Sequence, residues 1–115
     1  METHRLVLPG DLNQYGFLFG GRLLAWIDEA SWIAATLEYP GRKFVTRAMD
    51  TVAFRHSVRE GSILRIDCQR DQLGTTSVTY AVQVHREASE MEPIFSTRVT
   101  FVCVDNEGNK CAIAP

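Results

Sequence analysis

The sequence predicts an α+β fold, with an antiparallel sheet curled around one long helix, and two observations lead to this class. Apolar residues first recur at spacings of three and four along one stretch of the chain, as on one face of a helix. These residues are Leu23, Ile27, Ala30, Ala34 and Leu37. From Lys43 onward the apolar period changes to two, and four β-rich runs follow at hairpin-like distances. One helix followed by four long strands favours a single sheet packed on that helix.

The length and composition indicate one domain spanning residues 1–115. The chain has 115 residues, of which 45% are hydrophobic and 23% charged, and no repeat or linker-like segment interrupts it. A domain of this size stabilises its own core but has little room for a deep ligand cavity. We therefore expect any substrate pocket to be shared between subunits.

Charge and hydropathy exclude two classes of partner. The formal net charge is −2, from 12 basic and 14 acidic residues spread along the chain, so no basic patch predicts nucleic-acid binding. No apolar run approaches the roughly 20 residues that span a bilayer. The first residues, METHRLVLPGD, also lack the pattern of a secretion signal. We expect a cytoplasmic protein without a membrane span.

The cysteines indicate reduced thiols. Cys68, Cys103 and Cys111 are odd in number and lack Cys-x-x-Cys spacing, which fits a reducing compartment. We expect them to pack as small buried hydrophobic residues. No group of His, Cys or carboxylate residues has metal-ligand spacing, so we expect neither a metal nor a cofactor.

The elements are expected in a fixed order along the chain. A short strand over residues 4–9 ends at Pro9-Gly10, and a glycine-rich loop leads to a helix opened by Gly20 and Gly21. That helix ends before Pro40-Gly41 and, being apolar on several faces, should be enclosed on most sides. Strands follow within residues 43–58, 62–73, 75–87 and 93–108, with turns at Glu60-Gly61, at Leu73-Gly74 and within residues 87–93.

Two adjacent acids in the apolar helix need an explanation. Asp28 and Glu29 are rotated by about 100° from one another, so they do not share one role easily. A carboxylate among apolar neighbours should be either paired or functional, and Arg22 is a candidate partner for Glu29. The glycines at the helix start either expose amides that polarise a carbonyl or simply allow a tight entry into the helix.

The stretch NQYGFLFGGRLLAWIDEA, residues 13–30, resembles the loop and central helix of the hotdog-fold acyl-coenzyme A thioesterases. That family carries an Asn-x-x-Gly-x-x-Phe-Gly-Gly loop followed by a helix with an acid. The resemblance extends through FVTRAMDTVAFRHSVREGSI, DQLGTTSVTYAVQV and TFVCVDNEG, from Leu6 to Gly108. It implies the hotdog fold, an antiparallel sheet wrapped around one long central helix. Phe17 stands where many relatives have a polar residue.

The resemblance implies hydrolysis of acyl-coenzyme A thioesters to coenzyme A and a free fatty or other carboxylic acid. Asp28 matches the family's catalytic acid, acting either as general base or as nucleophile. Asn13 matches the second catalytic residue, supplied by a neighbouring subunit, so a homodimer is the catalytic unit and a homohexamer, a trimer of dimers, the expected assembly. Two structural alternatives stay open on the residues alone: Asn13 is an ordinary turn residue, or both acids only line a water-filled subunit interface.

Contacts to the acyl-coenzyme A substrate are expected from the loop, the first long strand and a later hairpin. Basic and glycine-rich positions suit the phosphates, although arginines on a strand often form its solvated face and Leu-Gly-Thr-Thr is often only a turn. The expected substrate-binding residues are Phe19, Gly20, Gly21, Arg47, Phe54, Arg55, Gly74, Thr75 and Thr76.

Two other functions compete with hydrolysis. A non-catalytic acyl-coenzyme A-binding module keeps the helix end and the pocket without needing Asp28. An enoyl-thioester hydratase pairs a His with an acid, and the absence of any His between His4 and His56 disfavours it.

Overall fold

The structure is a computed structural model that describes residues 1–87 and 92–114. One strand, β1, and a short 3-10 helix, η1, precede a long helix, α1, and four strands follow it. The bounds are β1 Glu2–Leu6, η1 Pro9–Asp11, α1 Gly20–Glu38, β2 Lys43–Phe54, β3 Ile63–Leu73, β4 Ser77–Arg86 and β5 Phe95–Val104. The strand expected at residues 4–9 thus lies slightly earlier. Of the turn expected at residues 87–93, residues 88–91 lie outside the described part.

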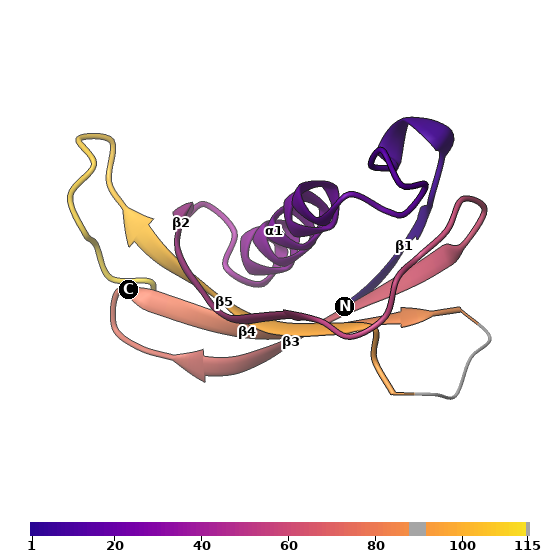
Figure 1. The fold of residues 1–115 in the computed structure, drawn as a ribbon. Helices are drawn as coiled ribbons and strands as arrows, with labels where there is room; N and C mark the ends of the chain where they lie inside the picture. The colour runs from indigo at the N-terminus through magenta and orange to yellow at the C-terminus, as the bar shows by residue number, and fades with distance from the viewer. Residues whose placement is uncertain (88–91, 115) are drawn as a thin grey trace.

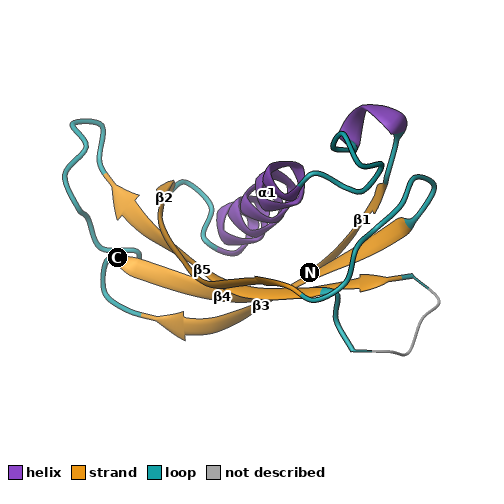
Figure 2. Ribbon diagram, in the orientation of Figure 1, coloured by secondary structure: helices purple, strands orange, loops and turns teal. Residues whose placement is uncertain are grey.

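All five strands form one antiparallel sheet in the order β1-β3-β4-β5-β2. The sheet curves beneath α1, which lies across its concave face (Figure 1). Figure 2 shows one helix layer on one sheet layer, so the predicted α+β architecture is confirmed. In the described residues, no helix is both long and apolar enough to cross a membrane.

The expectation that Glu60-Gly61 joins neighbouring strands is wrong. β2 pairs only with β5 at one edge of the sheet, whereas β3 lies between β1 and β4. The connecting residues 55–62 instead bond to the N-terminal part of the chain. The amide of Leu18 donates to the Val58 carbonyl at 2.7 Å, and the amide of Gly61 donates to the Val7 carbonyl at 2.9 Å. This connection holds the loop that precedes α1 against one end of the sheet.

The core lies between the concave face of the sheet and one face of α1. Leu23, Trp26, Ile27, Ala30 and Ala34 are buried on that helix face, as the apolar spacing predicts for most of them. Each fully buried large apolar side chain stabilises the fold by roughly 1.5–3 kcal/mol. The strands contribute buried residues that include Leu64, Ile66, Val82, Val99 and Phe101.

The prediction that the helix is enclosed on most sides is wrong for a single protomer. Trp32 is 42% exposed, Ile33 37% and Leu37 69%, all on the part of α1 that the sheet leaves uncovered. One curved sheet covers only one side of a cylinder, so the apolar residues on the other faces need a second covering layer.

Strand β2 is an unprotected edge in the protomer. Val45 and Val52 are each 46% exposed, and the side of β2 away from β5 has no neighbouring strand within the described residues. Register shifts interrupt its pairing with β5 after Thr46 and after Asp50. Long apolar edges of this kind are surfaces for pairing with another chain.

Candidate active site

Asp28 lies midway along α1 and faces strand β2. Its carboxylate Oδ1 accepts a hydrogen bond from the hydroxyl of Thr46 at 2.6 Å. One turn later, the indole of Trp32 donates to the carbonyl of Phe44, also on β2, at 3.2 Å. The Asp28 side chain is therefore held at the open edge of the sheet, half-buried, by a neutral partner that orients the carboxylate without neutralising its charge.

Glu29 faces the opposite edge of the sheet. Its carboxylate forms an ion pair with Arg5 of β1, and the guanidinium carbon of Arg5 lies 5.4 Å from the centre of the Trp26 ring. The suggested pairing of Glu29 with Arg22 is wrong, because Arg22 lies 3.4 Å from the carboxylate of Asp11. Thus Glu29 pairs with a cation at the β1 edge, whereas Asp28 bonds to a neutral hydroxyl at the β2 edge.

Asn13 organises the loop before α1. Its side-chain oxygen accepts hydrogen bonds from the amides of Tyr15 at 2.9 Å and Phe17 at 3.1 Å, as in an Asx turn. Because Oδ1 has these partners, the side-chain NH₂ is the group that Asn13 can offer to a ligand. The turn and the ligand role therefore use different atoms of one side chain.

A cavity of about 330 Å³ lies beside this loop. It is bounded by the loop, the start of α1 and the residues that follow β2. Arg59 packs over the ring of Phe17 close by, with its guanidinium carbon 5.0 Å from the ring centre. The lining residues are Asn13, Phe17, Leu18, Gly20, Leu23, Phe54, Arg55, His56, Ser57 and Val58. Four of the expected site residues, Asn13, Gly20, Phe54 and Arg55, are thus brought together.

The first turn of α1 presents free amides at the cavity. Within the described part of the chain, the amides of Gly20 and Gly21 donate no hydrogen bond, and Phe19 before them provides no side-chain cap. A Cβ at Gly20 would lie 3.1 Å from the ring of Phe54, and one at Gly21 would lie 2.9 Å from the ring of Phe19. A side chain at either position would therefore displace an aromatic ring. With glycine at both positions, the positive end of the helix dipole remains accessible.

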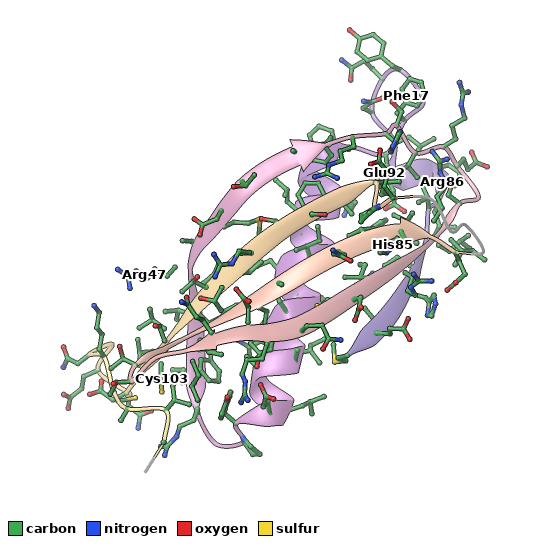
Figure 3. The ribbon with its side chains drawn as sticks, turned by 90° about the horizontal axis from the view of Figure 1, so that it is seen from below. Phe17, Arg47, His85, Arg86, Glu92 and Cys103 are labelled. Atoms are coloured by element: carbon green, nitrogen blue, oxygen red, sulfur yellow. The ribbon has the colours of Figure 1, made fainter. Side chains whose placement is uncertain are left out.

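The other expected substrate contacts lie at the opposite end of the sheet. Gly74, Thr75 and Thr76 immediately precede β4. Near the start of β4, Val78 pairs with Phe101 of β5, and Phe101 pairs on its other side with Thr46 of β2. Phe54, which lines the cavity, lies eight residues after Thr46 along β2, a distance of roughly 26 Å. Figure 3 shows Arg47 at the β2 edge, directed away from the sheet and far from Phe17. One protomer does not bring these residues to the cavity.

Asp28 is also separate from the cavity in one protomer. It is not among the lining residues, and α1 rises roughly 12 Å between Gly20 and Asp28. The two residues expected to act together, Asn13 and Asp28, are therefore apart within a single chain.

Sequence reasoning missed Thr46, the hydrogen-bond partner of Asp28. A threonine in a β-rich run is typical of any strand, and only the fold brings it beside a helix residue eighteen positions away. Ser57 and Val58 were missed for the same reason, because they lie on the connection that replaces an expected hairpin, and Leu18 bonds to Val58 from the loop before α1. The described residues contain no group of three metal-binding side chains.

Comparisons with known proteins place this arrangement in a family. The family model of the thioesterase superfamily matches residues 15–92. The uncharacterized acyl-CoA thioester hydrolase YkhA of Bacillus subtilis is 32% identical over 111 residues, covering 94% of this chain and 63% of that relative. The chain belongs to the thioesterase superfamily, but it spans less than two thirds of the length of YkhA.

Solved structures agree in fold. An acyl-CoA hydrolase from Staphylococcus aureus, in complex with butyryl coenzyme A, is 31% identical with a TM-score of 0.84, covering 97% of this chain and 67% of that one. Cj0915, a hexameric hotdog-fold thioesterase of Campylobacter jejuni, is 31% identical with a TM-score of 0.86, covering 97% and 88%. The hotdog fold is therefore confirmed. Variants of the Staphylococcus aureus enzyme replace an asparagine, an aspartate or a threonine by alanine.

Proposed function

We propose that this protein hydrolyses acyl-coenzyme A thioesters to coenzyme A and a free carboxylic acid. The observation that carries the proposal is the Asp28 carboxylate, oriented by Thr46 at the open edge of the sheet. The relatives named above as acyl-CoA hydrolases support it. In the Staphylococcus aureus variants, the replaced asparagine and aspartate are fifteen positions apart, as are Asn13 and Asp28.

The active site is shared between two protomers. A carbonyl held at the Gly20 amide lies too far from Asp28 of the same chain, given the rise of roughly 12 Å along the helix. A second copy docked at β2 by a two-fold axis places the two α1 helices side by side and antiparallel. Asp28 of one copy then faces the cavity of the other. The homodimer is the catalytic unit, and assembly into a homohexamer follows the hexameric relative.

The arrangement supplies each group that thioester hydrolysis requires. The amides of Gly20 and Gly21 stabilise the negative charge that develops on the thioester oxygen, and the Asn13 NH₂ positions the carbonyl or the attacking water. Asp28 either removes a proton from that water or attacks the carbonyl carbon to form an anhydride that water then cleaves. Both routes break the carbon–sulfur bond and release coenzyme A as the thiolate. Thr46 is a positioning residue for Asp28.

The coenzyme A part of the substrate needs cationic and glycine-rich contacts. Arg55 lines the cavity, and Phe54 and Phe19 provide apolar surface for the thioester-bearing arm or the acyl chain. Arg47 and the turn of Gly74, Thr75 and Thr76 serve the substrate of a neighbouring protomer, because they lie at the far end of their own.

A panel of acyl-coenzyme A substrates, followed with a thiol-trapping dye, tests the proposal. We expect thiol release with at least one acyl chain length. No turnover with any chain length would refute hydrolysis, and tight binding without turnover would identify a non-catalytic binding module.

Hydration of an enoyl thioester is a second candidate, favoured by one observation. His56 lines the cavity, and its Nε2 lies 3.3 Å from the carboxylate of Glu92. Incubation with crotonyl-coenzyme A separates the two reactions. Hydration removes the conjugated enoyl absorbance without releasing thiol, whereas hydrolysis releases thiol.

We further propose that residues 1–115 act as one domain in the cytoplasm. The free cysteines Cys68, Cys103 and Cys111 support a reducing compartment. Cell fractionation that finds the protein with membranes or outside the cytoplasm would contradict this location.

A further inference from the structure

Two of the three cysteines lie against one another. The sulfur atoms of Cys103 and Cys111 are 3.0 Å apart, closer than an ordinary contact between two sulfurs, at the end of the sheet opposite the cavity. Figure 3 shows Cys103 there, remote from Phe17. Cys103 is fully buried at the end of β5, whereas Cys111 is partly exposed. The expectation of small buried hydrophobic residues is thus confirmed for Cys68 and Cys103, whereas Cys111 is only partly buried.

The backbone holds the pair in a register suited to a covalent bond. Val104 and Lys110 form an antiparallel bridge, the amide of Cys111 donates to the carbonyl of Cys103 at 3.0 Å, and the amide of Asp105 donates to Asn109 at 2.8 Å. Cys103 and Cys111 are thus directly opposite one another. One backbone hydrogen bond joins the two cysteines, because the Cys103 amide donates to Thr76 instead. Disulfides join residues whose Cα atoms lie about 4.4–6.8 Å apart, and opposed residues of neighbouring strands lie at such distances.

We propose that Cys103 and Cys111 form a dithiol site that a low-molecular-weight disulfide, RSSR, converts to an internal disulfide. The Cys111 thiolate attacks one sulfur of RSSR, which forms a mixed disulfide and releases the first RSH. Cys103 then loses its proton and attacks the Cys111 sulfur, which forms the Cys103–Cys111 bond and releases the second RSH. The protein loses two electrons and two protons, and the small disulfide is reduced to two thiols.

The two cysteines have different parts because their surroundings differ. Cys111 is accessible to the incoming disulfide. Burial, together with the contact from Cys111, raises the pKa of the Cys103 thiol, so alone it reacts slowly at neutral pH. Cys103 reacts because the mixed disulfide on Cys111 is adjacent to it. Burial also raises the pKa of Cys68 to about 11, and Cys68, on β3, serves as an unreactive internal control.

The new bond would fasten the segment after β5 to the end of β5, beside the β3–β4 turn. The amide of Cys103 donates to the carbonyl of Thr76 at 2.8 Å, and the amide of Ile113 donates to the carbonyl of Thr75 at 2.9 Å. Arg42 adds a hydrogen bond from Nε to the Ile113 carbonyl at 2.8 Å. Closing a short loop through the cysteines restricts the unfolded chain, so oxidation should raise the thermal midpoint by roughly 5–10 °C.

Incubation of the native protein with glutathione disulfide tests the proposal. Intact mass spectrometry should show the loss of two hydrogens, and peptide mapping without reduction should find Cys103 linked to Cys111, with Cys68 still free. Dithiothreitol should reverse the change. A persistent glutathione adduct on wild-type Cys111, or no reaction at all, would overturn the proposal.

Matched serine variants separate the two steps. Cys103→Ser should stop at the mixed disulfide on Cys111, Cys111→Ser should remain unmodified, and Cys68→Ser should oxidise like the wild type. Equal adduct formation by wild type and Cys103→Ser would contradict the resolving role of Cys103. If a variant fails to fold, the wild-type peptide map alone decides the outcome.

Discussion

Asp28 and Glu29 are neighbours in sequence, yet they occupy different regions of the molecule. Asp28 faces β2, is half-buried and bonds to the neutral hydroxyl of Thr46. Glu29 faces β1, is exposed and pairs with the cation of Arg5.

The difference distinguishes the acid that we propose takes part in hydrolysis from the acid that is paired with a cation. A rotation of about 100° between consecutive helix residues is enough to direct them to opposite edges of the sheet. The acid that faces β2 bonds to a neutral hydroxyl. The acid that faces β1, the strand at the other edge of the sheet, is paired with a cation. We expect charge compensation to distinguish the roles of the two acids.

The largest effect is expected from Asp28→Asn, which keeps the size of the side chain and removes its basicity. Hydrolysis should fall by roughly two to three orders of magnitude, as for loss of a general base or nucleophile. Steady-state rates with the best acyl-coenzyme A measure it, and Glu29→Gln is the matched control. An unchanged rate in Asp28→Asn would move the catalytic role away from this residue.

Mixing two inactive variants tests whether Asp28 acts across the subunit boundary. Asn13→Asp keeps an oxygen for the Tyr15 and Phe17 amides and removes the NH₂ donor. Random exchange of Asn13→Asp with Asp28→Asn protomers makes half of the dimers mixed, each with one intact site, so about a quarter of wild-type activity should return. Activity measured after co-refolding gives the answer. No recovery, despite mixed dimers seen by native mass spectrometry, would place both residues in one protomer's site.

A smaller effect is expected at Thr46. Thr46→Val removes the hydroxyl that orients Asp28 and should lower kcat about tenfold, equivalent to one hydrogen bond of roughly 1.4 kcal/mol. Thr46→Ser should restore most of the rate because it restores the donor. Separate measurement of kcat and KM checks this, and a change in KM alone would show that Thr46 contacts substrate instead.

The smallest effect is expected at Glu29. Glu29→Gln should leave kcat within about twofold of wild type and change the free energy of unfolding by less than about 1 kcal/mol, since exposed ion pairs contribute little. Urea unfolding and steady-state kinetics measure both quantities. A large loss of activity with unchanged stability would remove the distinction between the two acids.

The sequence predicts the local elements well and the long-range arrangement poorly. The helix from Gly20 and the four strands after Lys43 follow from apolar period and turn residues, which are local properties. The position of β2 at the sheet edge does not follow from local properties. Glu60-Gly61 resembles an ordinary hairpin turn, and only the hydrogen bond from Gly61 to the distant Val7 shows that β2 and β3 are not neighbours.

The candidate site also contains some residues that local sequence predicts and others that it does not. The Asn13 loop and the Gly20-Gly21 helix start are contiguous in sequence and could be predicted. Thr46 and the far placement of Gly74 depend on strand register, which periodicity does not fix.

The two tryptophans of α1 give the protein its own optical probe. Trp32 is 42% exposed and bonds to β2, whereas Trp26 is only 8% exposed beneath Arg5. If a second copy covers the β2 edge, Trp32 enters a drier environment and its emission shifts to shorter wavelength, while Trp26 remains an internal reference. Fluorescence recorded on dilution therefore reads out the assembly equilibrium directly, without a label.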